Sequence, residues 1–221
     1  MSLLSLLAAA LGATALWLGW ATVTAARRRK AARAGYFAAV APLFDRITTR
    51  IEPTGFARMT AHHGPHAFDL QVVQDSLTFR KLPALWVMLT LPEALPVQAT
   101  LDIMARPTGQ EPFSHFLRLP HTLPCPAILP DGTAIRSDDA ALVPPEPLIA
   151  PHLGLFADPK VKELVISPKG LRLVILAEEA ERGRFLIFRD AEMGLTPLAP
   201  HRLAPLIDTL LALRAALTNA T

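Results

Sequence analysis

The chain has 221 residues, a formal net charge of +3 and a single cysteine, and 51% of its residues are hydrophobic. Beyond an N-terminal segment of about 25 residues, the remainder suffices for one hydrophobic core and is short for two, so we expect one soluble domain. The lone Cys125 excludes an intramolecular disulfide and a zinc site built from cysteines. Five positive charges gather near the N-terminus and the rest of the chain is close to neutral, which argues against nucleic-acid binding.

The N-terminal segment, residues 1–26, predicts a transmembrane anchor. It contains no charged side chain, and its apolar run from Leu3 to Ala26 exceeds the roughly 20 residues that cross a bilayer core. A cleaved signal peptide is the alternative interpretation. Such peptides carry a positive region before a shorter apolar stretch, whereas no lysine or arginine precedes this run. The pattern therefore favours an uncleaved anchor.

A cluster of basic residues directly after the span predicts its orientation. Positive charges near the ends of a span favour the cytoplasmic side, so we expect a bacterial inner-membrane protein with its N-terminus outside and its soluble domain in the cytoplasm. Contact with anionic lipid headgroups is also expected, with each cation contributing about 1 kcal/mol. The cluster, called the basic collar below, consists of Arg27, Arg28, Arg29, Lys30 and Arg33.

Small side chains recur along the span at alternating spacings of three and four residues. Such a face lets another membrane helix approach closely, because backbones can meet where side chains are short. An alanine-rich composition can produce the same stripe by chance, so packing against a partner helix and chance both remain open. The stripe, called the small-residue face below, consists of Ser5, Ala8, Gly12, Ala15, Gly19 and Thr22 and reaches Ala26.

The segment 27–52 combines the basic collar with a predicted juxtamembrane amphipathic helix. Apolar residues from Phe37 to Ile51 recur every three or four positions, which predicts a helix over residues 31–51. Gly35 and Pro42 are expected to bend or restart it, since proline lacks the backbone N–H of a helix interior. Residues 53–221 then form the predicted soluble domain.

Alternation of apolar and polar residues predicts sheet strands within this domain. A hairpin is expected between residues 84–91 and 97–105, and a second one around Pro168-Lys169-Gly170. Residues 107–130 are rich in proline and indicate a long surface excursion, while a short helix is expected near residues 148–158 and a final helix over 200–217. The predicted strands cover residues 68–72, 77–80, 84–91, 97–105, 133–137, 164–167, 171–176 and 184–189.

These elements together predict an α+β fold. A transmembrane helix is followed by a largely antiparallel sheet, which packs with the juxtamembrane helix and the C-terminal helix. Short connections between strands favour antiparallel pairing, and no βαβ series occurs in the sequence.

Three histidines, His62, His63 and His66, are the first candidates for chemistry, since imidazole is a common metal ligand. Gly64-Pro65 makes this segment a turn, and no nearby carboxylate or cysteine completes a familiar spacing. A solvated turn is therefore the favoured interpretation, and we predict no bound metal.

The other candidate groups for catalysis or ligand binding also have simpler structural interpretations. Asp138 and Asp139 could act as an acid/base pair or hold magnesium, but their setting before prolines favours a cap or turn. Cys125 lacks a basic neighbour that would activate its thiol. The sequence has no phosphate-binding glycine motif, and the cation and aromatic pairs at residues 79–81 and 188–189 are too few to indicate a nucleic-acid platform.

The sequence thus predicts a non-catalytic accessory, assembly or structural subunit of a bacterial membrane protein complex. It would dock onto integral membrane proteins through the small-residue face and would need no cofactor. The alternative is a membrane-tethered enzyme or lipid-binding protein with a site assembled in the soluble domain. His62, His66, Asp138 and Asp139 are the polar candidates for the enzymatic alternative.

Overall fold

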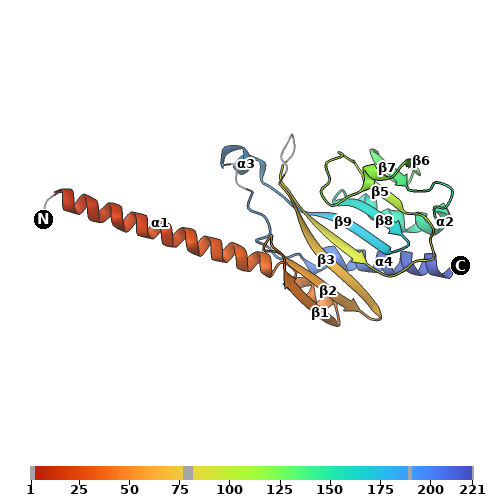
Figure 1. Ribbon diagram of the computed structural model, residues 1–221, viewed down its shortest axis with the longest axis horizontal. Coiled ribbons are helices and arrows are strands. Elements are labelled where there is room, and N and C mark those ends of the chain that lie inside the picture. The colour runs from red at the N-terminus through yellow and green to blue at the C-terminus, as the bar shows by residue number, and fades with distance from the viewer. Residues whose placement is uncertain (1–2, 77–81, 189–190, 221) are drawn as a thin grey trace.

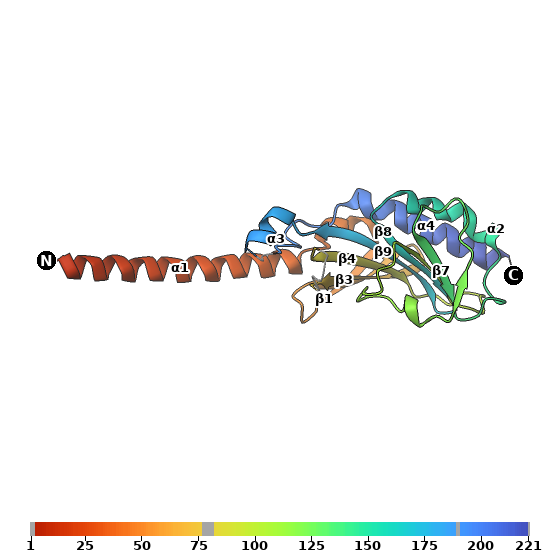
Figure 2. The same ribbon diagram turned by 90° about the horizontal axis from the view of Figure 1, so that it is seen from above.

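The computed structural model describes residues 3–76, 82–188 and 191–220, and it confirms the predicted α+β fold. A long N-terminal helix projects from one end of a domain built on a single antiparallel sheet, and a C-terminal helix lies along one face of that sheet (Figures 1 and 2). The predicted strand at residues 77–80 lies outside the described residues.

Helix α1 (Leu3–Ala34) contains the whole apolar segment and the basic collar without interruption. By length and composition it is able to cross a membrane, and its most apolar stretch is not buried against the domain. It ends directly before Gly35, and buried Tyr36 and Phe37 then begin the hydrophobic core. The apolar segment is therefore joined to the domain through a continuous helix.

The predicted amphipathic helix over residues 31–51 is wrong beyond Ala34. A 3-10 helix, η1 (Ala38–Leu43), follows and buries Val40, and Arg46–Ile51 forms strand β1 at the edge of the sheet. Gly35 directly follows the end of α1, as expected, whereas Pro42 lies inside η1 and does not restart a helix. The run Ile-Thr-Thr-Arg-Ile is rich in β-branched residues, which favour extended backbone, and this preference prevails over the helical spacing.

The described residues form a sheet of nine strands, and all of its pairings are antiparallel. Their order is β1-β2-β3-β4-β9-β8-β5-β7-β6. The hairpin predicted around Pro168 is confirmed, because β8 and β9 pair directly. The strands after β1 are β2 (Ala57–His63), β3 (His66–Asp75), β4 (Ala84–Leu91), β5 (Leu101–Ala105), β6 (His121–Leu123), β7 (Thr133–Ser137), β8 (Val161–Ser167) and β9 (Gly170–Glu179).

The hairpin predicted between residues 84–91 and 97–105 is wrong. Strand β4 pairs with β3 and β9, whereas β5 begins only at Leu101 and pairs with β7 and β8. The proline-containing segment between β4 and β5 does not turn back on itself. It carries the chain to the far half of the sheet, past strands that are formed later in the sequence.

The main core lies between the sheet and helix α4 (Pro200–Asn219), which confirms the predicted C-terminal helix. Five leucine and isoleucine side chains of α4 are buried at helical spacing, and the short helices α2 (Glu146–Ile149) and η3 (Ala150–Ala157) extend this layer. Burial of this apolar face supplies most of the helix's stability. The buried residues of α4 are Leu203, Ile207, Leu210, Leu213 and Leu217.

The predicted surface excursion, residues 107–130, is more deeply packed than expected. Phe113 and Phe116 are buried, and the Phe113 ring lies 5.1 Å from that of Trp86 on β4. The segment also contains the 3-10 helix η2 (Phe116–Arg118) and strand β6. Side chains alternate between the two faces along β4, and the neighbours of Trp86 belong to the main core. Trp86 therefore lies on the opposite face of the sheet, and the 107–130 segment covers part of that face.

The strand predicted at residues 184–189 is also wrong, because Arg182–Phe188 forms helix α3. The carboxylate of Glu181 accepts hydrogen bonds from the backbone N–H groups of Gly183 and Arg184, at 2.9 and 2.8 Å. Such caps satisfy N–H groups that have no partner inside the helix. This local capping explains why an apolar run with strand-like composition becomes helical here.

Replacing Gly170 with alanine is expected to lower the free energy of unfolding by about 2–3 kcal/mol. Gly170 has a φ of +133°, and an added Cβ would lie 2.1 Å from the backbone oxygen of Leu91. Gly64→Ala is the matched control, because Gly64 also has a positive φ but no atom lies within 4 Å of the position of an added Cβ. Urea unfolding of both variants measures the difference, and equal losses would contradict this packing argument.

Candidate functional site: the exposed face of helix α1 and a buried polar network

The small-residue face runs along the exposed part of α1. Ala8, Gly12, Ala15, Gly19 and Thr22 are all exposed, and no heavy atom lies within 4 Å of a Cβ built at either glycine. The side chain of Ser5 lies outside the described residues. The described portion of this face is therefore accessible to another helix, and its role in packing stays a prediction.

Hydroxyl groups within the span already have acceptors in the same helix. Thr22 Oγ1 donates to the carbonyl oxygen of Leu18 at 2.7 Å, and Thr14 Oγ1 donates to that of Ala10 at 2.8 Å. In a bilayer core these polar groups have no water to bind, so internal hydrogen bonds lower the cost of inserting them. Contact at the small-residue face would therefore depend on close packing.

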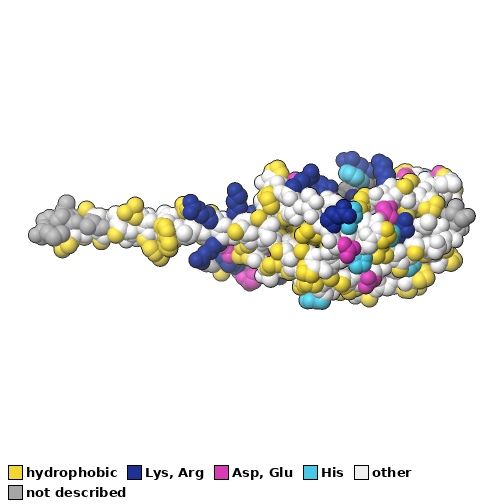
Figure 3. Space-filling model, turned by 90° about the horizontal axis from the view of Figure 1, so that it is seen from below, with side chains coloured by type: hydrophobic (Ala, Val, Ile, Leu, Met, Phe, Trp, Pro, Cys, Tyr) yellow, Lys and Arg dark blue, Asp and Glu magenta, His cyan; other side chains and the backbone are white. Residues whose placement is uncertain are grey.

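The basic collar divides into two groups. Arg27, Arg28 and Lys30 are exposed, and basic side chains surround the point where the helix meets the domain (Figure 3). Arg29 Nη1 lies 3.7 Å from Glu192 Oε1, and the Arg33 guanidinium lies 5.3 Å from the centre of the Phe56 ring. The first group makes no such contact in the described structure, and its contact with lipid headgroups stays a prediction. Arg29 and Arg33 fasten α1 to the domain.

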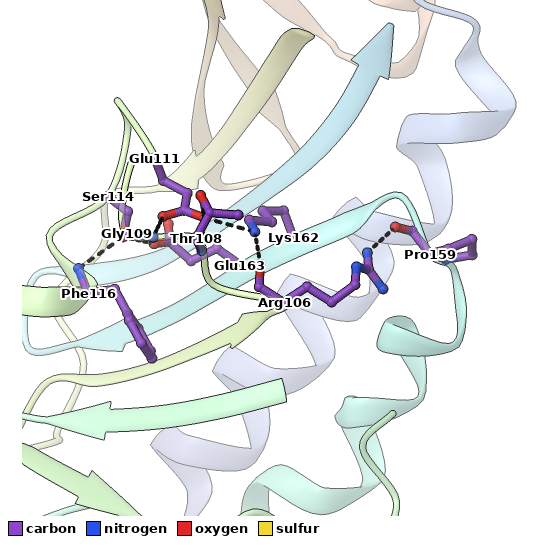
Figure 4. A network of polar contacts seen from close by, with 9 residues as sticks. All are labelled: Arg106, Thr108, Gly109, Glu111, Ser114, Phe116, Pro159, Lys162 and Glu163. Carbon is purple, nitrogen blue, oxygen red and sulfur yellow. Dashed lines mark hydrogen bonds and ion pairs between the residues drawn. The ribbon is translucent and has the colours of Figure 1, made fainter. Parts of the chain in front are cut away.

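A buried polar network lies on the sheet face beneath the 107–118 segment. It joins Asp102 on β5, Glu163 on β8 and Arg172 on β9, which are neighbouring strands. Asp102 and Glu163 are only 2% and 0% exposed. Arg172 Nη2 lies 3.0 Å from Glu163 Oε2, and the Ser114 hydroxyl donates to the other oxygen of Glu163. Ser114 thereby ties the covering segment to the sheet (Figure 4).

The two buried carboxyl groups favour retention of a proton. Burial, followed by the charge of neighbouring Glu163, raises the pKa of Asp102 to about 8. Burial also raises the pKa of Glu163, although the positive charge of Arg172 opposes this shift. Two adjacent carboxylates in a poorly solvated site repel one another, so a shared proton stabilises the pair.

A β-bulge at the start of β8 brings a second ion pair into the same region. The bulge leaves both Lys162 and Glu163 buried, and Lys162 Nζ lies 3.0 Å from Glu111 Oε1. Lys162 also donates to the carbonyl oxygen of Arg106 at 2.7 Å. Burial lowers the pKa of Lys162. Bulges commonly redirect a side chain in this way.

Glu111 organises the loop that covers this part of the sheet. Its carboxylate accepts hydrogen bonds from the backbone N–H groups of Thr108 and Gly109, at 2.7 and 2.9 Å. Burial opposes ionisation, but the hydrogen bonds from Thr108 and Lys162 outweigh it and lower the pKa of Glu111 to about 2. Glu111 and Lys162 therefore form a charged clasp between the loop and β8 (Figure 4).

A cavity of about 250 Å³ lies beside this clasp, with Trp86, Arg106, Lys162 and Leu176 among its lining residues. The indole Nε1 of Trp86 is buried and has no hydrogen-bond partner among the described residues. Asp102 and Glu163 do not line the cavity. The lining also includes the buried carboxyl group of Asp75 and the side chains of Thr108 and Lys160, so the cavity presents charged groups, a hydroxyl and one indole donor.

Two of the three histidines considered as metal ligands have separate partners. His63 Nδ1 lies 2.9 Å from the carbonyl oxygen of Leu43, and His66 Nδ1 lies 2.8 Å from Glu93 Oε1. His62 precedes the predicted turn on β2. Within residues 3–76, 82–188 and 191–220, no group of three or more histidine, cysteine or acidic side chains is arranged to hold a metal ion.

The other residues considered for chemistry also occupy structural or isolated positions. Asp138 Oδ1 accepts from the backbone N–H of Thr100 at 2.7 Å, and Asp139 Oδ1 accepts from that of Ala141 at 2.9 Å. Asp139 thus stabilises a turn, as its sequence context favours, whereas Asp138 joins the chain directly after β7 to the residue before β5. Cys125 is largely exposed, and the partial burial of its thiol raises its pKa.

Sequence reasoning missed the buried network. Its signal was the presence of charged residues inside apolar strands: Asp102 in Leu-Asp-Ile-Met-Ala, and Lys162-Glu163 in Val-Lys-Glu-Leu-Val. Charged side chains are seldom fully buried unless they are paired, so such positions merit attention. No protein-family model matches this chain, and a search among curated proteins finds no relative.

Proposed function

We propose that this protein is a non-catalytic accessory, assembly or structural subunit of a bacterial inner-membrane protein complex. The observation that carries the proposal is the continuity of α1. The most apolar stretch of α1 is not buried against the domain. The same helix continues into the domain, where Arg29 and Arg33 fasten it. A partner bound to the span would therefore also be held at a defined place relative to the domain.

The small-residue face is the proposed docking surface for an integral membrane partner. Helices in lipid gain little from hydrophobic burial, so association depends on close packing and favours small side chains. Gly12 and Gly19 leave the most room, since no heavy atom lies near either Cβ position. The hydroxyl of Thr22 has an internal acceptor, which leaves this face without an unsatisfied hydroxyl at that position.

The proposed topology places the N-terminus outside and the domain in the cytoplasm. Its basis is the basic collar, which directly follows the apolar segment. Arg27, Arg28 and Lys30 are exposed and are expected to contact anionic headgroups. The uninterrupted helix across residues 24–30 also favours an anchor that is retained.

Replacing both Gly12 and Gly19 with leucine is expected to reduce recovery of a membrane partner by at least about tenfold. Added bulk would separate the helix backbones. Ala10→Leu with Ala13→Leu is the matched control, because these residues lie on the opposite side of α1 by helical geometry. Quantitative co-purification from native membranes compares the variants. Equal recovery with both pairs would remove the small-residue face as the docking surface.

The cavity beside Lys162 supports a second candidate, a ligand-binding or enzymatic function of the domain. The observation that favours it is the unpaired indole N–H of Trp86, which could donate to a ligand. We rank it second because Lys162 and Glu111 already neutralise one another. The buried carboxyl pair also lies outside the cavity lining and is almost inaccessible to solvent.

A further inference from the structure

Helix α3 exposes two large apolar side chains at the end of the domain from which α1 projects. Leu186 is 56% exposed and Ile187 is 73% exposed, whereas Phe185 is only 8% exposed. At 100° per residue, Leu186 and Ile187 flank the direction of Gly183, and Phe185 points away from that direction. The helix is therefore held against the domain through Phe185, while Leu186 and Ile187 form an exposed apolar side.

The position of α3 brings this apolar side to the depth of the basic collar. Along the long axis of the molecule, α3 lies level with the last turns of α1 in both ribbon views (Figures 1 and 2). Glu192 bridges the two helices, because its carboxylate oxygens lie 3.7 Å from Arg29 Nη1 and 3.0 Å from Arg184 Nη2. Arg29 follows the apolar segment by three residues, which corresponds to about 4.5 Å of helix.

We propose that α3 is a second membrane contact, which inserts Leu186 and Ile187 into the headgroup and acyl boundary of an anionic bilayer. Amphipathic segments bind this zone through apolar side chains flanked by cations. Exposed Arg182 and Arg184 supply those cations, and Glu192 links Arg184 to Arg29 of the basic collar. This inference rests on the part of the proposed function in which α1 spans a bilayer.

The consequence is a domain with a fixed orientation on the membrane. A single helix allows a domain to rotate and tilt about its point of attachment, whereas a second contact away from that helix restrains both motions. The Glu192 bridge holds the chain between α3 and α4 against α1. Any surface of the domain used by a partner would then be presented at a constant height above the leaflet.

The test uses the full-length protein with Cys125→Ser, reconstituted into vesicles of phosphatidylcholine and phosphatidylglycerol. An environment-sensitive fluorophore is attached to cysteine in the Ile187→Cys variant and, as a control, in the Ile128→Cys variant. Ile128 is 59% exposed and lies in the connection between β6 and β7, at the end of the domain away from α1 (Figure 1). Lipids with a shallow spin label serve as the quencher.

The expected result is quenching at residue 187 at least about threefold stronger than at residue 128. Arg182→Glu should weaken the quenching at 187, because it repels anionic headgroups. Equal quenching at both positions would overturn the inference. The inference would also be overturned if the fluorophore at residue 187 moved to an apolar environment only after a protein partner was added. Quenching of Trp17 and Trp20 by lipids brominated in their acyl chains reports insertion of α1. Failure there overturns the spanning role, whereas insertion without quenching at 187 overturns only the role of α3.

Discussion

Replacing Asp102 with asparagine is expected to remove most of the pH dependence of stability between about pH 5 and pH 8. The pKa of Asp102 is about 8 in the folded protein, against an ordinary value of 3.8. Across this range Asp102 in the folded state thus keeps a proton that the same residue in the unfolded chain has already released. The free energy of unfolding of the wild type should therefore fall by about 4 kcal/mol as the pH rises from 5 to 8.

Asparagine resembles the protonated acid in shape and supplies an N–H donor toward Glu163, so the variant should stay stable at pH 8. Urea unfolding of the full-length protein in detergent, followed by circular dichroism at several pH values, measures the two slopes. Asp208→Asn is the control, since Asp208 lies on the exposed side of α4. If the Asp102 variant and the wild type lose stability in parallel with rising pH, a shared buried proton is not the cause.

Replacing Arg172 with methionine is expected to lower the free energy of unfolding by about 3–5 kcal/mol at pH 8. Arg172 lies 3.0 Å from Glu163, which is fully buried, and it favours the ionised form of that carboxyl group. Without the cation, Glu163 must either stay charged and unpaired or take up a proton. Protonation is easier at low pH, so the loss should be smaller at pH 5 than at pH 8.

This pH trend is opposite in sense to that of the Asp102 variant, because removing Arg172 should steepen the fall in stability with pH. Arg172→Lys provides the control, since it keeps a positive charge near Glu163 but gives up the planar guanidinium. It should recover part of the lost stability at pH 8. A loss in the methionine variant that is the same at pH 5 and pH 8 would indicate lost packing and would contradict the electrostatic account.

Local patterns predicted the elements of the fold better than their pairing. The turn at Pro168-Lys169-Gly170 and the flanking apolar residues were sufficient to predict the β8–β9 hairpin, because its contacts are close in sequence. Strand β4 also pairs with β9 and β5 also pairs with β8, for example Leu91 with Leu171 and Ile103 with Leu164, and the segment 84–105 carries no information about these distant strands. Proximity in sequence was a poor guide there.

Two errors concerned segments whose periodicity fits more than one structure. Residues 46–51 continue a helical spacing but are rich in β-branched side chains, and they form an edge strand. Residues 182–188 resemble a strand in composition but begin with a cap from Glu181. In each case a short-range preference of the backbone outweighed the pattern of apolar residues.

The part of the candidate site on α1 was predictable, and the buried part was not. Absence of charge over residues 1–26 and the basic collar after it are linear features, and α1 joins them in one helix. The network of Asp102, Glu163 and Arg172 joins strands whose order in the sheet could not be inferred. The bridge from Arg29 through Glu192 to Arg184 likewise depends on where α3 lies in space.

The central claim is that α1 joins this protein to an integral membrane partner. A pull-down of the full-length protein from its native membrane in mild detergent, followed by mass spectrometry, tests it most directly. A variant lacking residues 1–30 serves as the control. Stoichiometric recovery of integral membrane proteins with the intact chain, and not with the shortened one, is the predicted result. Recovery of the protein without any such partner would contradict the claim.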